Sequence, residues 1–89
     1  MVKTYTHICH GTCSRSIDIE YDTETKKLIN VSFVGGCNGN LKGINQLVKG
    51  MYMNDVHDKL IGVMCGSKNT SCPNQLAIAI EEIKALDNL

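Results

Sequence analysis

The sequence predicts an α+β fold in which a three-stranded antiparallel β-meander is followed by three helices packed on one face of the sheet. Residues 2–34 contain three short segments rich in sheet-forming residues, separated by polar or glycine-containing joins. Residues 41–86 contain three segments with apolar residues at helical spacing. Short joins favour antiparallel strand pairing, and strands followed by helices are typical of α+β domains.

The strands are predicted from residue type and alternation. Residues 2–9 contain Thr, Tyr and Ile, which are common in strands. Residues 16–21 alternate between apolar and polar types, so one face of this strand carries Ile17, Ile19 and Tyr21. After a polar turn, the third strand is predicted over residues 28–34. Its apolar face is expected to hold Ile29, Val31 and Phe33.

The first two helices are predicted from apolar spacing and from residues that begin or end helices. The apolar positions of the first helix are Leu41, Ile44, Leu47, Val48 and Met51. Asn40 is its predicted N-cap, and Gly50 is the predicted glycine at its C-terminal end. The second helix is predicted over residues 55–61, with Asn54 as its N-cap and Gly62 as the residue that stops it.

The third helix is the clearest of the three, because Pro73 suits the first position of a helix. Its apolar stripe consists of Leu76, Ile80, Ile83 and Leu86. With Pro73 at the first position, Cys72 is the predicted N-cap. A thiolate there would meet free backbone N–H groups and the positive end of the helix dipole. No linker or repeat interrupts the chain, so residues 1–89 are expected to form a single domain.

Charge and composition exclude several classes of function. Nine basic residues balance nine acidic residues, so we expect neither a nucleic-acid-binding surface nor a polybasic membrane anchor. The N-terminal residues lack an apolar signal stretch, and no run of about 18 apolar residues occurs. We therefore expect a cytoplasmic protein. No catalytic triad pattern or nucleotide-binding glycine motif stands out. His10, in the Cys9–Cys13 loop, is interpreted as solvent-exposed, with a ligand role as the alternative. His7 and His57 are interpreted as ordinary polar residues, and Glu81 and Glu82 as a solvated helix face.

Five cysteines are the main functional signal, and all of them lie in predicted loops or at the ends of predicted elements. They are Cys9, Cys13, Cys37, Cys65 and Cys72. Thiols are normally reduced inside cells, where cysteines serve metal binding, redox chemistry or simple packing. Element ends in a sheet-and-helix layer can meet at one edge, where thiolates are able to bind a metal. Asn38 and Ser71 flank two of the cysteines and are able to donate hydrogen bonds to ligand sulfurs. The residue pattern alone leaves open a metal site, a reversible thiol pair and idle thiols.

Four motifs resemble the TSCPD domain family, and together they cover nearly the whole chain. They are Gly11-Thr12-Cys13-Ser14, Gly35-Gly36-Cys37-Asn38-Gly39-Asn40, Cys65-Gly66 and Thr70-Ser71-Cys72-Pro73-Asn74-Gln75-Leu76. The resemblance implies that Cys13, Cys37, Cys65 and Cys72 are metal ligands, for zinc or an iron–sulfur cluster. Cys9 falls outside the motifs and would be the odd thiol. The family motif ends in aspartate where this chain has Asn74, which leaves that position a capping or hydrogen-bonding role.

The same resemblance implies a connection with ribonucleotide reductase, because this domain also occurs at the C-terminus of some of these enzymes. An 89-residue chain is too small for the barrel that nucleotide reduction needs, so we expect no autonomous catalysis. The leading hypothesis is a cysteine-ligated metal domain associated with ribonucleotide reductase and deoxynucleotide supply. The alternatives are a dithiol relay that re-reduces a reductase and a non-catalytic interaction module. The predicted architecture is also similar to that of iron–sulfur scaffold proteins, which gather cysteines from separate loops at one end.

Overall fold

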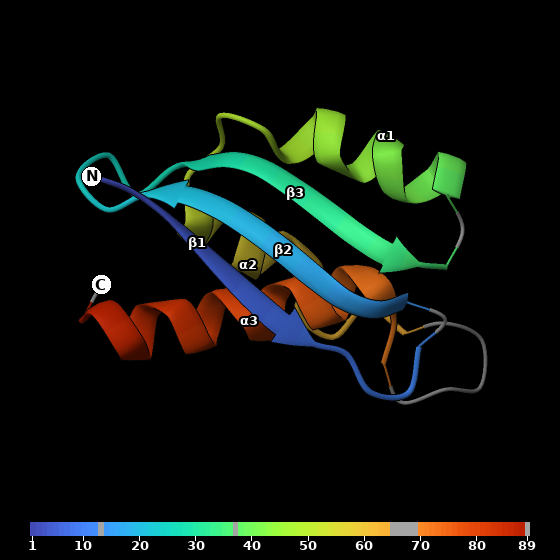
Figure 1. The fold of residues 1–89 in the computed structure, drawn as a ribbon. Coiled ribbons are helices and arrows are strands. Elements are labelled where there is room, and N and C mark those ends of the chain that lie inside the picture. Colours follow the sequence, from blue (N-terminus) through green and yellow to red (C-terminus); the bar gives the residue numbers. More distant parts are fainter. Residues whose placement is uncertain (13, 37, 65–69, 89) are drawn as a thin grey trace.

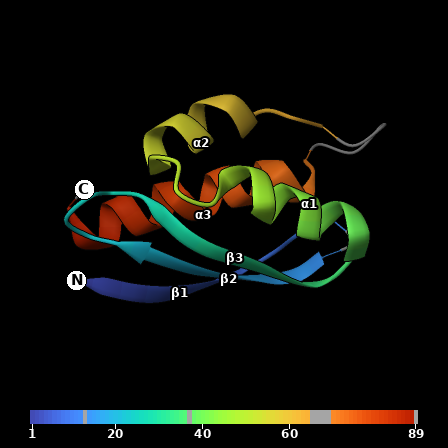
Figure 2. The same cartoon turned by 90° about the horizontal axis from the view of Figure 1, so that it is seen from above.

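The fold is a small α+β sandwich with one sheet and one layer of helices. A computed structural model describes residues 1–12, 14–36, 38–64 and 70–88 of the chain. Its elements are β1 (Val2–Ile8), β2 (Ser14–Asp22), β3 (Leu28–Gly35), α1 (Asn38–Val48), α2 (Met53–Leu60) and α3 (Cys72–Asp87). The strands pair antiparallel in the order β1-β2-β3, and the helices lie on one face of the sheet (Figures 1 and 2). The predicted fold class is therefore confirmed. No helix in the described ranges is both long and apolar enough to cross a membrane.

The hydrophobic core lies between the central strand β2 and the helix α3. Alternation along β2 turns one face inward, and the apolar stripe of α3 packs against it. Full burial stabilises the fold by about 1.5–3 kcal/mol for each large apolar side chain. The side chains that are almost completely buried are Ile17, Ile19, Tyr21, Leu28, Val31, Met53, Val56, Leu76, Ile80 and Ile83. The predicted stripe of α3 is correct except at Leu86, which is 66% exposed at the C-terminal end of the helix.

A bulge near the start of β3 changes which residues of this strand are buried. Glu20 pairs with Asn30, but Tyr21 pairs with Leu28, so the register shifts between these two pairs. The extra residue on β3 puts Leu28 beside Tyr21 in the core and leaves Ile29 only partly buried. The prediction that Ile29 lies on the buried face was therefore wrong, because simple alternation does not allow for a bulge.

The first helix starts and ends earlier than predicted. It begins at Asn38, so Asn40 lies within its first turn and is not the N-cap. It ends at Val48, and Gly50 follows in the left-handed conformation with φ of 80°, as expected for a glycine after a helix. The segment after Gly50 runs beside the start of β3, where Met51 accepts a hydrogen bond from the Leu28 N–H. Met51 therefore reaches the core from outside the helix, and Leu47 is 77% exposed.

The two remaining helices also begin one or two residues before the predicted positions. The N-cap of α2 is Tyr52, which makes no side-chain cap hydrogen bond. Asn54 lies inside α2 and was wrongly predicted to cap it. Ser71, not Cys72, is the N-cap of α3, and its hydroxyl accepts a hydrogen bond from the Asn74 N–H. Pro73 is compatible with this shift, because proline is tolerated anywhere in the first turn of a helix.

Candidate functional site

The element ends next to the predicted ligands gather at one end of the molecule. β2 starts beside the end of β3, since Ser14 pairs with Gly35, and α1 follows β3 directly. α3 starts at this same end (Figure 1). Cys13, Cys37 and Cys65 lie outside the described residues, as does the side chain of Asn38. The flanking elements thus converge, whereas the positions of these three thiols stay a prediction.

Cys72 occupies the first turn of α3 and is buried. Its side chain is 7% exposed, and its Sγ lies 2.9 Å from the Oγ of Ser14, the first residue of β2. The N-terminal end of a helix favours negative charge, so this position supports a thiolate. Although Cys72 is not the N-cap, it is still where the helix dipole acts. Ser14 was not predicted as a site residue, and its place in the Gly11–Ser14 motif was the available signal.

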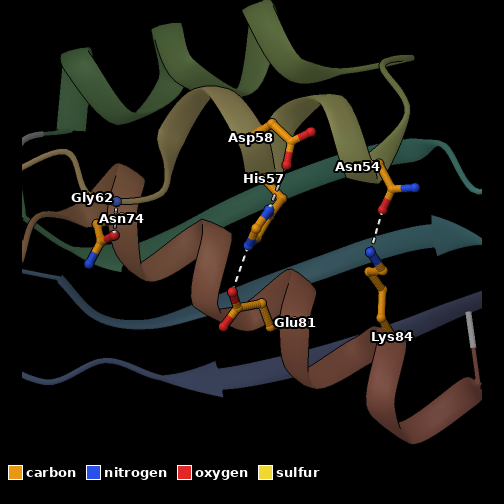
Figure 3. A network of polar contacts seen from close by, with 7 residues as sticks. All are labelled: Asn54, His57, Asp58, Gly62, Asn74, Glu81 and Lys84. Carbon is orange, nitrogen blue, oxygen red and sulfur yellow. Dashed lines mark hydrogen bonds and ion pairs between the residues drawn. The ribbon is translucent and has the colours of Figure 1, made fainter.

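Asn74 joins the start of α3 to the segment that follows α2. Its side chain is 6% exposed, and its Oδ1 accepts a hydrogen bond of 2.6 Å from the Gly62 N–H (Figure 3). Its Nδ2 donates to the Thr70 Oγ1 at 2.6 Å. Ser71 adds a second link, because its hydroxyl donates to the carbonyl of Val63. The stretch between these anchored residues contains Cys65, so both of its described ends are tied to α3.

Cys9 lies close to Cys72 but in a different chemical setting. It packs in the hydrophobic core with 9% of its surface exposed. Burial raises the pKa of the Cys9 thiol to about 11, and negative charge on Cys72 also raises it, against a lowering by the Thr12 hydroxyl. At neutral pH Cys9 is therefore a neutral thiol, which is a weak nucleophile and a weak ligand.

Comparison with known proteins identifies the family. The model of the TSCPD domain matches residues 2–84. The chain belongs to the TSCPD domain family. No curated protein and no solved structure matches this chain. Within the described ranges of this TSCPD domain, no group of three or more His, Cys, Asp or Glu side chains is placed to hold a metal ion.

Sequence reasoning missed a polar cluster that links β1 to α3 in this TSCPD domain. His7 is buried, with its Nδ1 lying 2.8 Å from Glu82 Oε1 and its Nε2 lying 2.7 Å from Gln75 Oε1. Tyr5 donates to the same Glu82 oxygen at 2.8 Å. Burial disfavours ionisation of Glu82, but the hydrogen bonds from His7 and Tyr5 outweigh it and lower its pKa. His7 and Glu82 are thus structural partners. The interpretation of His7 as an ordinary polar residue missed its burial, whereas Glu82 lies on an exposed face of the helix, as predicted.

A second polar cluster joins α2 to α3 on the surface. The Nε2 of His57 lies 2.6 Å from Glu81, and its Nδ1 lies 3.0 Å from Asp58 (Figure 3). Lys84 donates to Asn54 nearby, so α2 is attached to α3 by two polar contacts. Hydrogen bonds to Asp58 and Glu81 raise the pKa of His57, although burial opposes this. The cluster holds α2 in place just before Gly62, where the chain turns toward the cysteine end.

The contacts of Asn74 predict how its substitution affects stability. Asn74→Ala removes the acceptor for the Gly62 N–H, and we expect the free energy of unfolding to fall by about 1–3 kcal/mol. Asn74→Asp keeps this acceptor, and the Thr70 hydroxyl is able to rotate and donate to the second carboxylate oxygen. We therefore expect Asn74→Asp to lower the free energy of unfolding less than Asn74→Ala does, although burying the carboxylate has its own cost. Denaturant unfolding of both variants tests this, and equal damage by the two would contradict it.

The raised pKa of His57 predicts a pH dependence. A group whose pKa is higher in the folded state stabilises the fold below its unfolded pKa of about 6.5, and this contribution is lost as pH rises through the folded value. The stability difference between wild type and His57→Gln should therefore shrink as pH rises above about 6.5. We expect at most about 1 kcal/mol, because the partners are exposed. Lys84→Met is the matched control and should lack this pH dependence, whereas a flat His57→Gln difference would disprove the assignment.

Proposed function

We propose that this TSCPD domain binds one metal centre through Cys13, Cys37, Cys65 and Cys72, and that it works together with a ribonucleotide reductase. The main observation in support of the proposal is the position of Cys72. It lies in the first turn of α3, at the end of the fold where the elements flanking the other three cysteines converge. Zinc with four thiolate ligands is the simplest occupant, and an iron–sulfur cluster is the rival.

The surroundings of Cys72 suit a thiolate ligand. The start of α3 provides a positive electrostatic potential, and the Ser14 hydroxyl at 2.9 Å is able to donate a hydrogen bond to a negatively charged sulfur. Hydrogen bonds of this kind orient metal ligands and tune their basicity. Soft thiolate ligands favour zinc and iron–sulfur centres over magnesium or calcium. The chemistry of the donor set therefore agrees with the proposed occupants.

In this proposal the metal has a structural role. A chain of this size buries a small core, and a bound metal would link segments that are far apart in the sequence. Ser71 and Asn74 assist by holding the segment after α2 against α3 before any metal binds. A partly ordered site costs less conformational entropy to complete than one made entirely of loose loops.

A dithiol relay is the second candidate, since Cys9 and Cys72 are close enough for their charges to interact. In such a relay, Cys9 would form a reversible disulfide with Cys72, and its thiolate would attack a disulfide sulfur during exchange. The pKa of Cys9, raised to about 11 by burial, keeps it protonated and makes it a poor attacking thiol. The metal site therefore accounts better for four of the thiols, with Cys9 as part of the core.

Metal analysis of protein purified without oxygen tests the proposed site. We expect about one zinc ion per chain, or iron and sulfide in cluster proportions, and at least a severalfold loss of bound metal in Cys72→Ser. Cys9→Ala is the matched control, because it removes a nearby buried thiol and should keep the metal. A folded wild type that binds neither metal would contradict the proposal. A reversible two-electron thiol couple without metal would support the relay instead.

The connection with ribonucleotide reductase is tested by direct binding. The metal-loaded domain, immobilised through its C-terminus, should bind purified ribonucleotide reductase from the same organism in biolayer interferometry. Removal of the metal with a chelator should weaken this binding, because the cysteine end would lose its order. Absence of binding by the loaded domain would contradict the association while leaving the metal site intact.

A further inference from the structure

One edge of the sheet presents backbone groups to solvent in a regular pattern. The Cys9 N–H donates to the Arg15 carbonyl at 2.9 Å, which extends the β1–β2 ladder by one pair beyond Ile8 and Ser16. In an antiparallel ladder, hydrogen-bonded pairs alternate along the strand. Odd-numbered residues of β1 therefore direct their N–H and C=O groups to β2. The even-numbered residues direct theirs to the open edge, and they are Val2, Thr4, Thr6 and Ile8.

A groove runs beside this edge. Its volume is about 440 Å³, and it is lined chiefly by Tyr5, His7, His10, Gln75, Ile78 and Glu82. One wall is thus β1, and the other is the face of α3 that reaches β1. The β1–β2 register is regular from Val2 to Ile8, and no proline interrupts β1. The strand therefore lacks two common features that protect an edge from pairing, a bulge and a proline.

Glu82 gives the groove a negative charge. Its side chain is 42% exposed, and the hydrogen bonds from Tyr5 and His7 both reach Oε1. Among the described residues, no hydrogen bond to its Oε2 occurs, so this oxygen is available to a cation. A strand added to β1 would place every second side chain above α3, and the side chain opposite Tyr5 would lie next to Glu82.

We propose that the β1 edge binds an extended peptide segment of another protein by strand addition, with a basic side chain of that peptide paired to Glu82. Backbone hydrogen bonds to Thr4 and Thr6 would supply affinity, and Glu82 would select the charge. A second copy of this chain is a poorer occupant. The C-terminal half of α3 lies beyond the β1 edge (Figure 1), so pairing two copies through β1 would bring their α3 helices together.

The probe is an acetylated and amidated peptide of sequence Thr-Val-Thr-Lys-Thr-Val-Thr, which places lysine and both valines on one face. When it is titrated into the ¹⁵N-labelled 89-residue protein, the amide signals of Thr4, Thr6 and Ile8 should shift. These shifts should reach a plateau as more peptide is added. Replacing its lysine by glutamate should weaken binding about tenfold. Thr6→Pro removes an outward N–H without breaking the ladder to β2, and it should also weaken binding about tenfold.

Thr6→Val is the matched control for Thr6→Pro. Both variants lose the hydrogen bond from Thr6 to Asp18, but Thr6→Val keeps the outward N–H and should bind like wild type. Glu82→Gln should abolish the preference for the lysine peptide, with folding checked by the amide spectrum. The proposal is overturned if the β1 amides do not shift at millimolar peptide, or if Thr6→Pro and Thr6→Val bind equally. Concentration-dependent dimerisation through β1 in the absence of peptide would overturn it in favour of a second copy.

Discussion

A buried amide at the start of α3 is the constraint that fixes the cysteine end of the fold. Asn74 is almost fully buried, and burying an amide without partners costs several kcal/mol. Its oxygen and nitrogen are satisfied by the Gly62 N–H and the Thr70 hydroxyl. These two contacts require the end of α2 and the start of α3 to lie side by side. α3 in turn is held to β2 by Leu76, Ile80 and Ile83. The core therefore positions the amide, and the amide positions Gly62 at the end of α2.

The polar contacts of α3 divide its surface into sides with different partners. His7 and Tyr5 meet Glu82 on the side of β1, while His57 meets Glu81 on the side of α2. Neighbouring carboxylates on one helix therefore hold different elements. Because these pairs are directional, they fix the rotation of α3 more tightly than an apolar stripe does by itself. The start of the helix, which carries Cys72, is oriented by the same contacts.

The sequence predicts the features that depend on local periodicity. Alternation along β2 identified Ile17, Ile19 and Tyr21, because a strand with one buried face leaves that pattern in the chain. The stripe of α3 was predicted for the same reason. Ile29 was misplaced because a bulge adds a residue without a sequence signal. The pairing of His7 with Glu82 joins residues 75 positions apart, so nothing local marks it.

The candidate site was predicted only in part, because some of its contacts also leave no local signal in the sequence. Residue type and position placed Cys72 at the start of a helix, and the structure agrees to within one residue. Motif order placed the other three cysteines next to element ends, and those ends converge. The anchoring roles of Asn74 and Ser71 were not predicted, because their partners, Gly62 and Val63, are backbone groups. Backbone groups carry no residue signature, so only the fold shows which of them a side chain meets.

The proposed function requires four cysteines to share one metal at this end of the molecule. X-ray absorption at the edge of the metal found in protein purified without oxygen measures the ligands directly. We expect a first shell of sulfur only, with four scatterers at about 2.3 Å. A shell of nitrogen and oxygen ligands at about 2.0–2.2 Å would contradict it, because the bound metal would then be held by other residues.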